Sequence, residues 1–339
     1  MTHIAMDVHK KRSKLAYVTP SMTEPKVVGC YTTPAGFAKV LEGLPGPWVV
    51  CIEATRQSPA VVRWLQELGV AEIHLVDPHE LHRYLHGKPK SDARDAKEML
   101  DLHLVGRLPE CYLATQQVQD QRALSRGREG LRRISTQLRN VLRALLTQQG
   151  LDLPIRDLRG KAGQEQMAAV IPQLPEHTRF VVELLWEVLE HVELALRSAD
   201  GRIREAVAAD PIARALTELN GIGPMCAFGL LAEMAEIERF KDPAHLISYA
   251  GLAPRANDSD EHHGPRRLPM RCNKRLRRWS VLGAQGAVRC RGDSNARHTY
   301  CRIVKRLRPN TAKIAAARAL LKDVFYAWQQ AIASYDAAA

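Results

Sequence analysis

The chain has 339 residues and a net charge of +12, with 45% hydrophobic and 25% charged side chains. Its length predicts more than one domain, and its composition excludes a mainly disordered chain. No stretch approaches the roughly eighteen apolar residues of a membrane span, and charges stand where a signal peptide needs its apolar run. Seven scattered cysteines without a CxxC pair exclude a disulfide framework and a zinc ribbon. We therefore expect a soluble protein of the bacterial cytoplasm that does not enter membranes.

The N-terminal part, residues 1–115, predicts one α/β domain because short apolar runs alternate with amphipathic segments. Three early strands followed by alternating helix and strand are the order of an RNase H/RuvC-like fold. Periodicity alone does not separate this fold from other mixed α/β sheets. The expected strands are 3–9, 14–20, 26–32, 47–54 and 71–77, and the expected helices are 35–44, 58–69 and 92–105.

The middle part, residues 116–208, predicts two long amphipathic helices joined by a connection with Pro and Gly at about 150–175. Such a pair is typical of an antiparallel hairpin or coiled-coil arm that mediates oligomerisation. The last part, residues 209–339, predicts a mainly α domain. Its expected helices are 212–219, 224–237, 243–249 and 311–334.

Positive charge is concentrated in residues 251–310, which hold fifteen Lys and Arg and four acids, a net +11. A dense basic segment attracts phosphate backbones and makes affinity depend on salt. A solvated basic face is the simpler alternative. Because nearly all the excess charge lies in one segment, we favour a nucleic-acid partner.

Four acids of the first domain suggest a metal site. Asp7 ends the first strand, Glu53 ends the fourth, and Asp92 and Asp95 lie three apart at the start of a helix, on one face. Mg²⁺ prefers oxygen ligands, and an acid in an apolar strand is costly to bury unless it is paired or metal-bound. Taken singly, each acid is a helix cap, a turn residue or a surface ion-pair partner. Their order on one α/β domain favours the metal site.

Two further signals lie in the last domain. Gly221 and Gly223, in LNGIGPMCAFGLLAE, resemble the hairpin of a helix–hairpin–helix module, whose backbone N–H groups face a phosphate; a plain interhelical turn is the alternative. Ser259 lies beside two histidines and just before a dense set of arginines. A serine attacks phosphorus when its proton is removed and phosphate charge is neutralised nearby, although most loop serines have no such role.

The ordered motifs AMDVHKK, CIEAT, KSDARDA, LNGIGP, YAGLAPR-x₃-S and RCNKRLRR resemble the DEDD-type (Piv-like) insertion-sequence transposases, the family of bridge-RNA-guided serine recombinases. The resemblance runs from about residue 3 to 325. It implies a RuvC-like domain whose Mg²⁺ (or Mn²⁺) ligands match Asp7, Glu53, Asp92 and Asp95, and a nucleophile that matches Ser259. In that family the serine forms a covalent link to DNA, and a neighbouring subunit's acids complete the active site. The chain departs from the family at Asp260 and Cys272, where the family has glycines.

The sequence therefore predicts a transposase or recombinase that cuts and rejoins DNA through Ser259 and the acidic tetrad. The expected partners are donor and target DNA, a guide (bridge) non-coding RNA implied by the resemblance, and further copies of the chain in a dimer or tetramer. The alternatives are a Holliday-junction-type Mg²⁺-dependent nuclease and a non-catalytic nucleic-acid-binding protein. The expected nucleic-acid contacts are Lys10, Gly221, Gly223, Arg255, Arg266, Arg267, Arg271, Asn273, Lys274, Arg277 and Arg278.

Overall fold

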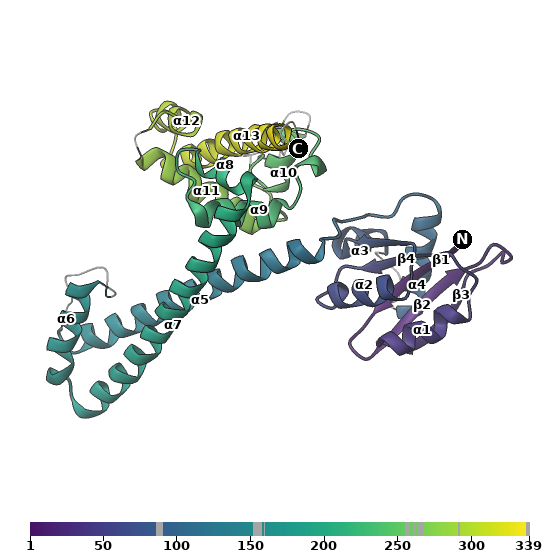
Figure 1. Ribbon diagram of the computed structural model, residues 1–339, viewed down its shortest axis with the longest axis horizontal. Coiled ribbons are helices and arrows are strands. Elements are labelled where there is room, and N and C mark those ends of the chain that lie inside the picture. The colour runs from purple at the N-terminus through teal and green to yellow at the C-terminus, as the bar shows by residue number, and fades with distance from the viewer. Residues whose placement is uncertain are drawn as a thin grey trace. The chain divides into compact units, whose positions relative to one another are not determined.

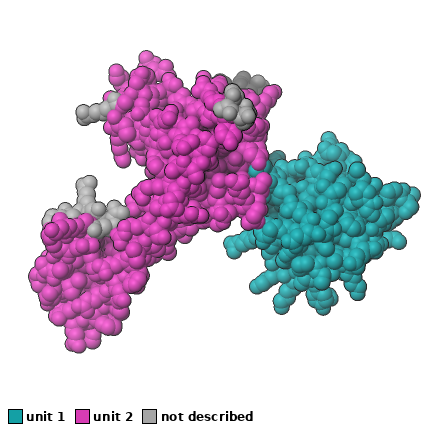
Figure 2. Space-filling view, in the orientation of Figure 1, with its two compact units in different colours: residues 1–114 teal, residues 115–339 magenta. Residues whose placement is uncertain are grey.

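The computed structural model describes residues 1–85, 91–151, 158, 160–254, 258–259, 262–263, 267–290 and 292–336. The chain divides into two compact units, residues 1–114 and 115–339 (Figures 1 and 2). This division places 116–208 in one unit with 209–339, so the three-domain scheme remains a prediction. Within the described ranges, no helix has both the length and the apolar character needed to cross a membrane.

Unit 1 is built on a five-stranded mixed sheet with the strand order β3-β2-β1-β4-β5. The central strand β1 pairs antiparallel with β2 and parallel with β4. All five expected strands are present within two residues of their predicted ends, and the sheet confirms the RNase H-like arrangement. The strands are β1 (Thr2–Val8), β2 (Arg12–Val18), β3 (Lys26–Tyr31), β4 (Trp48–Glu53) and β5 (Glu72–Val76).

Helices cover both faces of this sheet. Successive side chains of β1 point to opposite faces and therefore enter two different cores. Ile4 and Met6 pack with Phe37 in the core under α1 and α2, whereas Ala5 packs with Met99 in the core under α3 and α4. Such double burial explains why Ile4, Ala5, Met6 and Val8 of β1 are apolar, and it makes Asp7 exceptional among them. The helices are α1 (Pro34–Glu42), α2 (Ser58–Glu67), α3 (Pro78–Leu85) and α4 (Asp92–Leu104).

Unit 2 begins with an arm in which the long helices α5 (Gln116–Gln148) and α7 (Glu176–Ala209) pack together (Figure 1). Buried residues of α7 recur every seven positions, as in a coiled coil; they are Val182, Leu189, Leu196 and Ile203. The buried hydroxyl of Ser135 donates to Glu193 across the two helices. The pair confirms the predicted helical hairpin.

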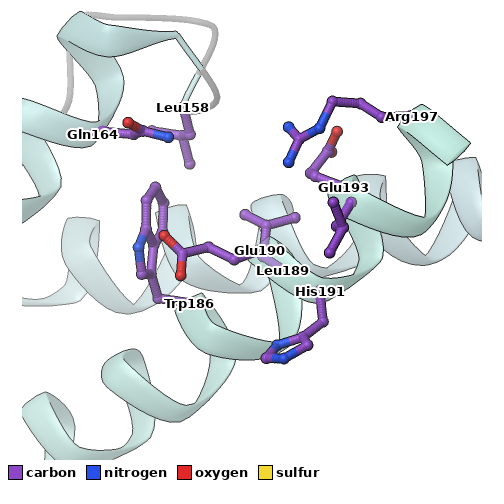
Figure 3. A pocket seen from close by; sticks show the side chains of 9 residues that line it. Leu158, Gln164, Trp186, Leu189, Glu190, His191, Glu193 and Arg197 are labelled. Atoms are coloured by element: carbon purple, nitrogen blue, oxygen red, sulfur yellow. The ribbon is translucent and has the colours of Figure 1, made fainter.

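The far end of the arm has its own small core, which the sequence pattern did not predict. Here α6 (Lys161–Val170) and a short 3₁₀ turn, η1 (Ile171–Gln173), occupy the expected connection. Met167 of α6 packs with Leu146 and Val182. A pocket of about 370 Å³ opens beside this core, where Gln164 lies across from Trp186 (Figure 3).

The rest of unit 2 is a helical domain around α9 (Pro224–Met234), which is buried from Cys226 onward. This helix ends three residues before the predicted 237, because Ala235 has φ +67° and stops it. The other elements are α8 (Pro211–Thr217), η2 (Ile237–Arg239), α10 (Pro243–Tyr249), β6 (Asp258–Ser259), β7 (His262–His263), α11 (Lys274–Arg289), α12 (Asn295–Val304) and α13 (Pro309–Asp336). The basic segment, residues 251–310, contains two helices that were not predicted, α11 and α12.

The turn between α8 and α9 carries the two glycines for which a helix–hairpin–helix-like element was predicted, and its first glycine is required by packing; the phosphate-binding role stays a prediction. Gly221 has φ +92°, and a Cβ at this position would lie 2.1 Å from the backbone nitrogen of Ala287 in α11. The turn therefore contacts α11 backbone to backbone, which only glycine allows. Gly223 is the exposed N-cap residue of α9.

Candidate active site

The acidic site of unit 1 lies where β1 and β4 end. The parallel register pairs Met6 with Ile52, so Asp7 and Glu53 follow side by side at the carboxyl ends of neighbouring strands. Asp7 has the same parity as Ala5 and therefore lies on the face that α4 covers. The first turn of α4 contributes Asp92 and Asp95. The fold thus brings four predicted residues to one edge of the sheet from three elements.

A histidine that the sequence analysis did not select joins two of these acids. The Nε2 atom of His9 lies 3.3 Å from Oδ2 of Asp7 and 3.4 Å from Oδ2 of Asp92. One possible ligand atom from each of the three residues lies within 4.8 Å of the other two. The sequence feature that could have indicated His9 is its position two residues after Asp7, an acid at the end of a buried strand. Among the described residues, this three-residue group does not include Glu53 or Asp95.

The electrostatics of Asp7 favour a bound cation. Asp7 is buried, with 8% of the residue exposed, and burial raises the pKa of its carboxyl. The neighbouring imidazole of His9 lowers that pKa, whereas the charges of Asp92 and Asp95 raise it. Burial disfavours the negative charge of the Asp7 carboxylate, and a divalent cation bound by the three side chains would offset that charge. Carboxylate oxygens suit Mg²⁺, and an added imidazole nitrogen is tolerated better by Mn²⁺.

Both ends of helix α4 pack against the sheet. Ala96 and Met99 contribute to the core with Ala5, close to the acidic turn. At the other end of the helix, His103 Nε2 lies 3.0 Å from His3 Nδ1, and burial lowers the pKa of both histidines. The acidic turn therefore belongs to a rigid element, as metal ligands require.

The predicted nucleophile, Ser259, lies in unit 2 on β6, which pairs with β7; each of these strands has two residues. Ser259 pairs with His262, and Asp258 pairs with His263. Only the backbone of Ser259 is described, and Asp260 lies outside the described residues. The structure therefore places the chain at Ser259 but not its hydroxyl.

Three of the residues that were predicted to contact nucleic acid bind other parts of the protein. Asn273 caps α11 by accepting from the backbone N–H groups of Arg275 and Leu276, and it donates to the buried carboxylate of Glu233. Arg277 donates to backbone carbonyls. Arg278 Nη1 lies 3.2 Å from Glu129 Oε1. These three residues therefore stabilise unit 2 in addition to any contact with nucleic acid.

Of the other predicted cations, four are exposed and two lie outside the described residues. Lys10 is exposed in the turn after β1, directly beside His9. Arg267, Arg271 and Lys274 are exposed before and at the start of α11. Arg255 and Arg266 lie outside the described residues. Exposed cations near the acids and near the Ser259 segment suit contact with a phosphate backbone.

Two family models match the chain: one covers unit 1 and helix α5 of unit 2, and the other lies within unit 2. Residues 4–150 match a model described as "Transposase", for the DEDD transposases of IS110 type, and residues 213–301 match the "Transposase IS116/IS110/IS902 family". The first range contains Asp7, Glu53, Asp92 and Asp95, and the second contains Ser259. Both units therefore carry the sequence pattern of the same family.

Individual bacterial relatives agree with these matches. A "Probable family 20 transposase" of Pseudomonas aeruginosa is 26% identical over 280 residues, which cover 80% of this chain and 81% of the relative. A "Putative transposase y4pF/y4sB" of Sinorhizobium fredii is 26% identical over 282 residues, covering 81% of this chain and 71% of that protein. A protein of insertion element IS110 from Streptomyces coelicolor is 32% identical over 120 residues, 35% of this chain and 29% of that protein. The chain belongs to the IS110/IS116 family of insertion-sequence transposases, which are DNA phosphoryl-transfer enzymes.

Proposed function

We propose that this transposase breaks and rejoins DNA through Ser259, with Asp7, Glu53, Asp92 and Asp95 as the ligands of Mg²⁺ or Mn²⁺. A DEDD transposase domain implies a divalent metal. The observation that carries the proposal is the convergence of Asp7, His9 and Asp92 at the carboxyl edge of the sheet. His9 adds a fifth residue to the proposed site. We expect the protein to act in the bacterial cytoplasm, on the nucleoid.

The proposed chemistry uses one covalent intermediate. The Ser259 oxygen loses its proton and attacks a DNA phosphorus, an O–P bond forms, and the bond to the leaving sugar oxygen breaks as that oxygen takes up a proton. Attack by the hydroxyl of another strand then reverses these changes and frees the serine. A bound divalent cation supplies positive charge that stabilises the phosphoryl oxygens. The acids of unit 1 would bind this metal ion, and exposed cations such as Lys274 would orient the DNA strand.

Guidance by a structured non-coding RNA is part of the proposal and derives from the family resemblance. The concentrated charge of residues 251–310 suits RNA as well as DNA. We expect purified protein, Mg²⁺ and a transcript of the region flanking the gene to join a plasmid carrying the element's ends to a target plasmid. The product would be detected by amplification across the new junction. Joining at an undiminished rate without the transcript would exclude RNA guidance.

The same reaction tests the runner-up, a Holliday-junction-type nuclease that uses the acids alone. Such an enzyme would release cleaved ends that accumulate and would form no junctions. A non-catalytic binding protein is not compatible with membership of a transposase family. Cleavage without joining, under conditions in which the transcript is bound, would favour the nuclease.

We further propose that the arm joins copies of this chain. An apolar groove of about 570 Å³ runs along α5 and α7, lined in part by Leu131, Leu184 and Val188. Leu184 and Val188 are 47% and 49% exposed, and Phe180 one turn earlier is 60% exposed. Positions 180, 184 and 188 form a stripe at helical spacing, which a second arm would cover as in a helical bundle.

The arm proposal predicts the effect of placing charge in this stripe. We expect Leu184→Lys combined with Val188→Lys to lower the oligomer mass, because burying two ammonium groups in an apolar interface is unfavourable. Multi-angle light scattering would measure the mass. Glu190→Lys, on another face of α7, is the control and should retain the wild-type mass. Recovery of the same oligomer after deletion of residues 116–208 would contradict the proposal.

A further inference from the structure

The segment that carries Ser259 leaves and re-enters the helical domain at one place. It starts after α10, which ends at Tyr249, and it ends where α11 begins at Lys274. The backbone N–H of Asn273 donates to the carbonyl of Tyr249 over 3.0 Å. The two ends of the segment therefore meet in a closed neck, defined here as residues 249–251 and 269–273.

Arg277, from the first turn of α11, binds both sides of this neck. Its Nε donates to the carbonyl of Ala250 over 3.2 Å, and its Nη2 donates to the carbonyl of Gly251 over 2.9 Å. The same Nη2 donates to the carbonyl of Pro269 over 2.6 Å. Two of these carbonyls precede Ser259 in the chain and one follows it. A planar guanidinium with several fixed donors can serve such an arrangement, whereas an ammonium has one nitrogen.

The neck is packed tightly around this guanidinium. Gly251 has φ +67°, and a Cβ there would lie 2.2 Å from Nη2 of Arg277 and 2.4 Å from the Cβ of Cys272. Neither the backbone conformation nor the space allows a larger residue. The glycine of the YAGLAPR motif and Arg277 of the RCNKRLRR motif therefore form one structural unit, although twenty-five residues separate them in the chain.

The N-terminus of α11 is itself held in place. Asn273 donates from Nδ2 to Oε2 of Glu233, which is 2% exposed and accepts two hydrogen bonds from Arg126 of α5. Burial acts to raise the pKa of Glu233, but the bonds and charge of Arg126, with those of Asn273 and Arg122, lower it below its ordinary value. The turn that carries Arg277 is thus rigidly connected to the buried core of unit 2.

From this geometry we propose that Arg277 is a positioning residue for Ser259: it clamps the neck and thereby limits the directions from which the serine segment approaches DNA. The inference rests on the proposed role of Ser259 as nucleophile. Arg277 would act by orienting the nucleophile, since a displacement of about 1 Å lowers a reaction rate about 100-fold. Arg277 would not have to touch DNA, since its described bonds are to carbonyls of the neck.

Hydrogen–deuterium exchange of the full chain without DNA tests the clamp directly. We expect Arg277→Ala to speed exchange in peptides covering 249–254 and 267–273, and Arg277→Lys to restore part of the protection. The matched control is Arg275→Ala, which removes the same charge from the same turn; this exposed guanidinium lies 3.8 Å from Glu129. Equal exchange in Arg277→Ala and Arg275→Ala would overturn the clamp.

The catalytic consequence is measured as covalent adduct formation on a DNA suicide substrate with the flanking transcript and Mg²⁺. We expect Arg277→Ala to slow this step about 100-fold while changing the DNA Kd no more than Arg275→Ala does. Equal effects of both variants on rate and Kd would show that Arg277 contributes only charge. If Ser259→Ala still forms the adduct, the proposed nucleophile fails, and the exchange result remains a separate test of the neck.

Discussion

Ser259→Ala is expected to abolish the covalent protein–DNA adduct while leaving DNA binding nearly unchanged. Removal of the hydroxyl removes the atom that would bond to phosphorus, whereas the exposed Arg267 and Lys274 can still contact the DNA backbone. The measurement uses a suicide DNA substrate with cognate nucleic acids and Mg²⁺, and the adduct is a band that resists denaturant. Wild-type protein should become trapped in this band.

Two further variants make this result specific. Ser334→Ala removes another hydroxyl of unit 2, one that donates to the carbonyl of Gln330 within α13, and should leave the adduct intact. Asp7→Ala should also abolish the adduct, through loss of the metal site. An undiminished adduct in Ser259→Ala would refute the assignment of the nucleophile, and the acids alone would then have to explain cleavage.

Asp7→Asn is expected to lower strand joining by about 10²- to 10⁴-fold, which corresponds to loss of the several kcal/mol that a metal ion contributes to the transition state. The amide keeps the size of the carboxylate but lacks its charge, so it is a poor ligand for a hard cation. Asp101→Asn is the matched control, because it removes an exposed carboxylate from α4 without changing the site. Equal activity of Asp7→Asn and wild type would exclude Asp7 from the metal site.

The same substitution should stabilise the metal-free protein by about 0.5–2 kcal/mol, the usual size of a single stabilising substitution, because the amide has no charge to bury. Burial raises the pKa of Asp7 above 3.8, so the folded chain binds this proton more tightly than the unfolded chain. The stability that the protonated carboxyl contributes is present below the unfolded pKa and is lost as the pH rises through the folded pKa. The advantage of Asp7→Asn should therefore be largest near neutral pH and shrink toward pH 4.

Urea denaturation with and without Mg²⁺ measures this effect. Wild-type protein and Asp101→Asn should gain stability from Mg²⁺, because a ligand that binds only the folded state shifts the equilibrium toward it. Asp7→Asn should gain little. An equal gain from Mg²⁺ in all three proteins would place the cation elsewhere.

Much of unit 1 could be predicted from local patterns. Its five strands are apolar runs with clear ends, and the buried central strand leaves Asp7 as its one charged residue. Parallel neighbours end at one edge of a sheet, which is why Glu53 could be assigned to the same place as Asp7. The arm was predictable for a similar reason, since long amphipathic periodicity has few other structural solutions.

Other features were decided by tertiary structure. Helix α3 has a short, polar sequence, PHELHRYL, and packs through Leu81 into the core with Val76. Helix α11 lies in a segment whose arginines suggested only a basic patch, yet its buried positions, from Leu276 and Trp279 to Ala287, recur at helical spacing. Four of the six buried residues of this helix are Ser, Gly or Ala, which are not strongly apolar, so the sequence shows only weak periodicity here. The close packing of α11 against Gly221 is visible only in the structure.

The sequence by itself indicated the family and the five strands along the chain, because these depend on residue type and local spacing. It also suggested the four acids as metal ligands, which stays a prediction. Only the tertiary structure placed His9 between Asp7 and Asp92, since its ring contacts carboxylates from two elements that are far apart in the chain. Only the tertiary structure distinguished Arg277 from Arg275, because its partners are carbonyls on both sides of the Ser259 segment. Hydrogen bonds to backbone atoms depend on how the chain is folded and not on the residue types that supply the carbonyls, so no pattern of side chains could have revealed them.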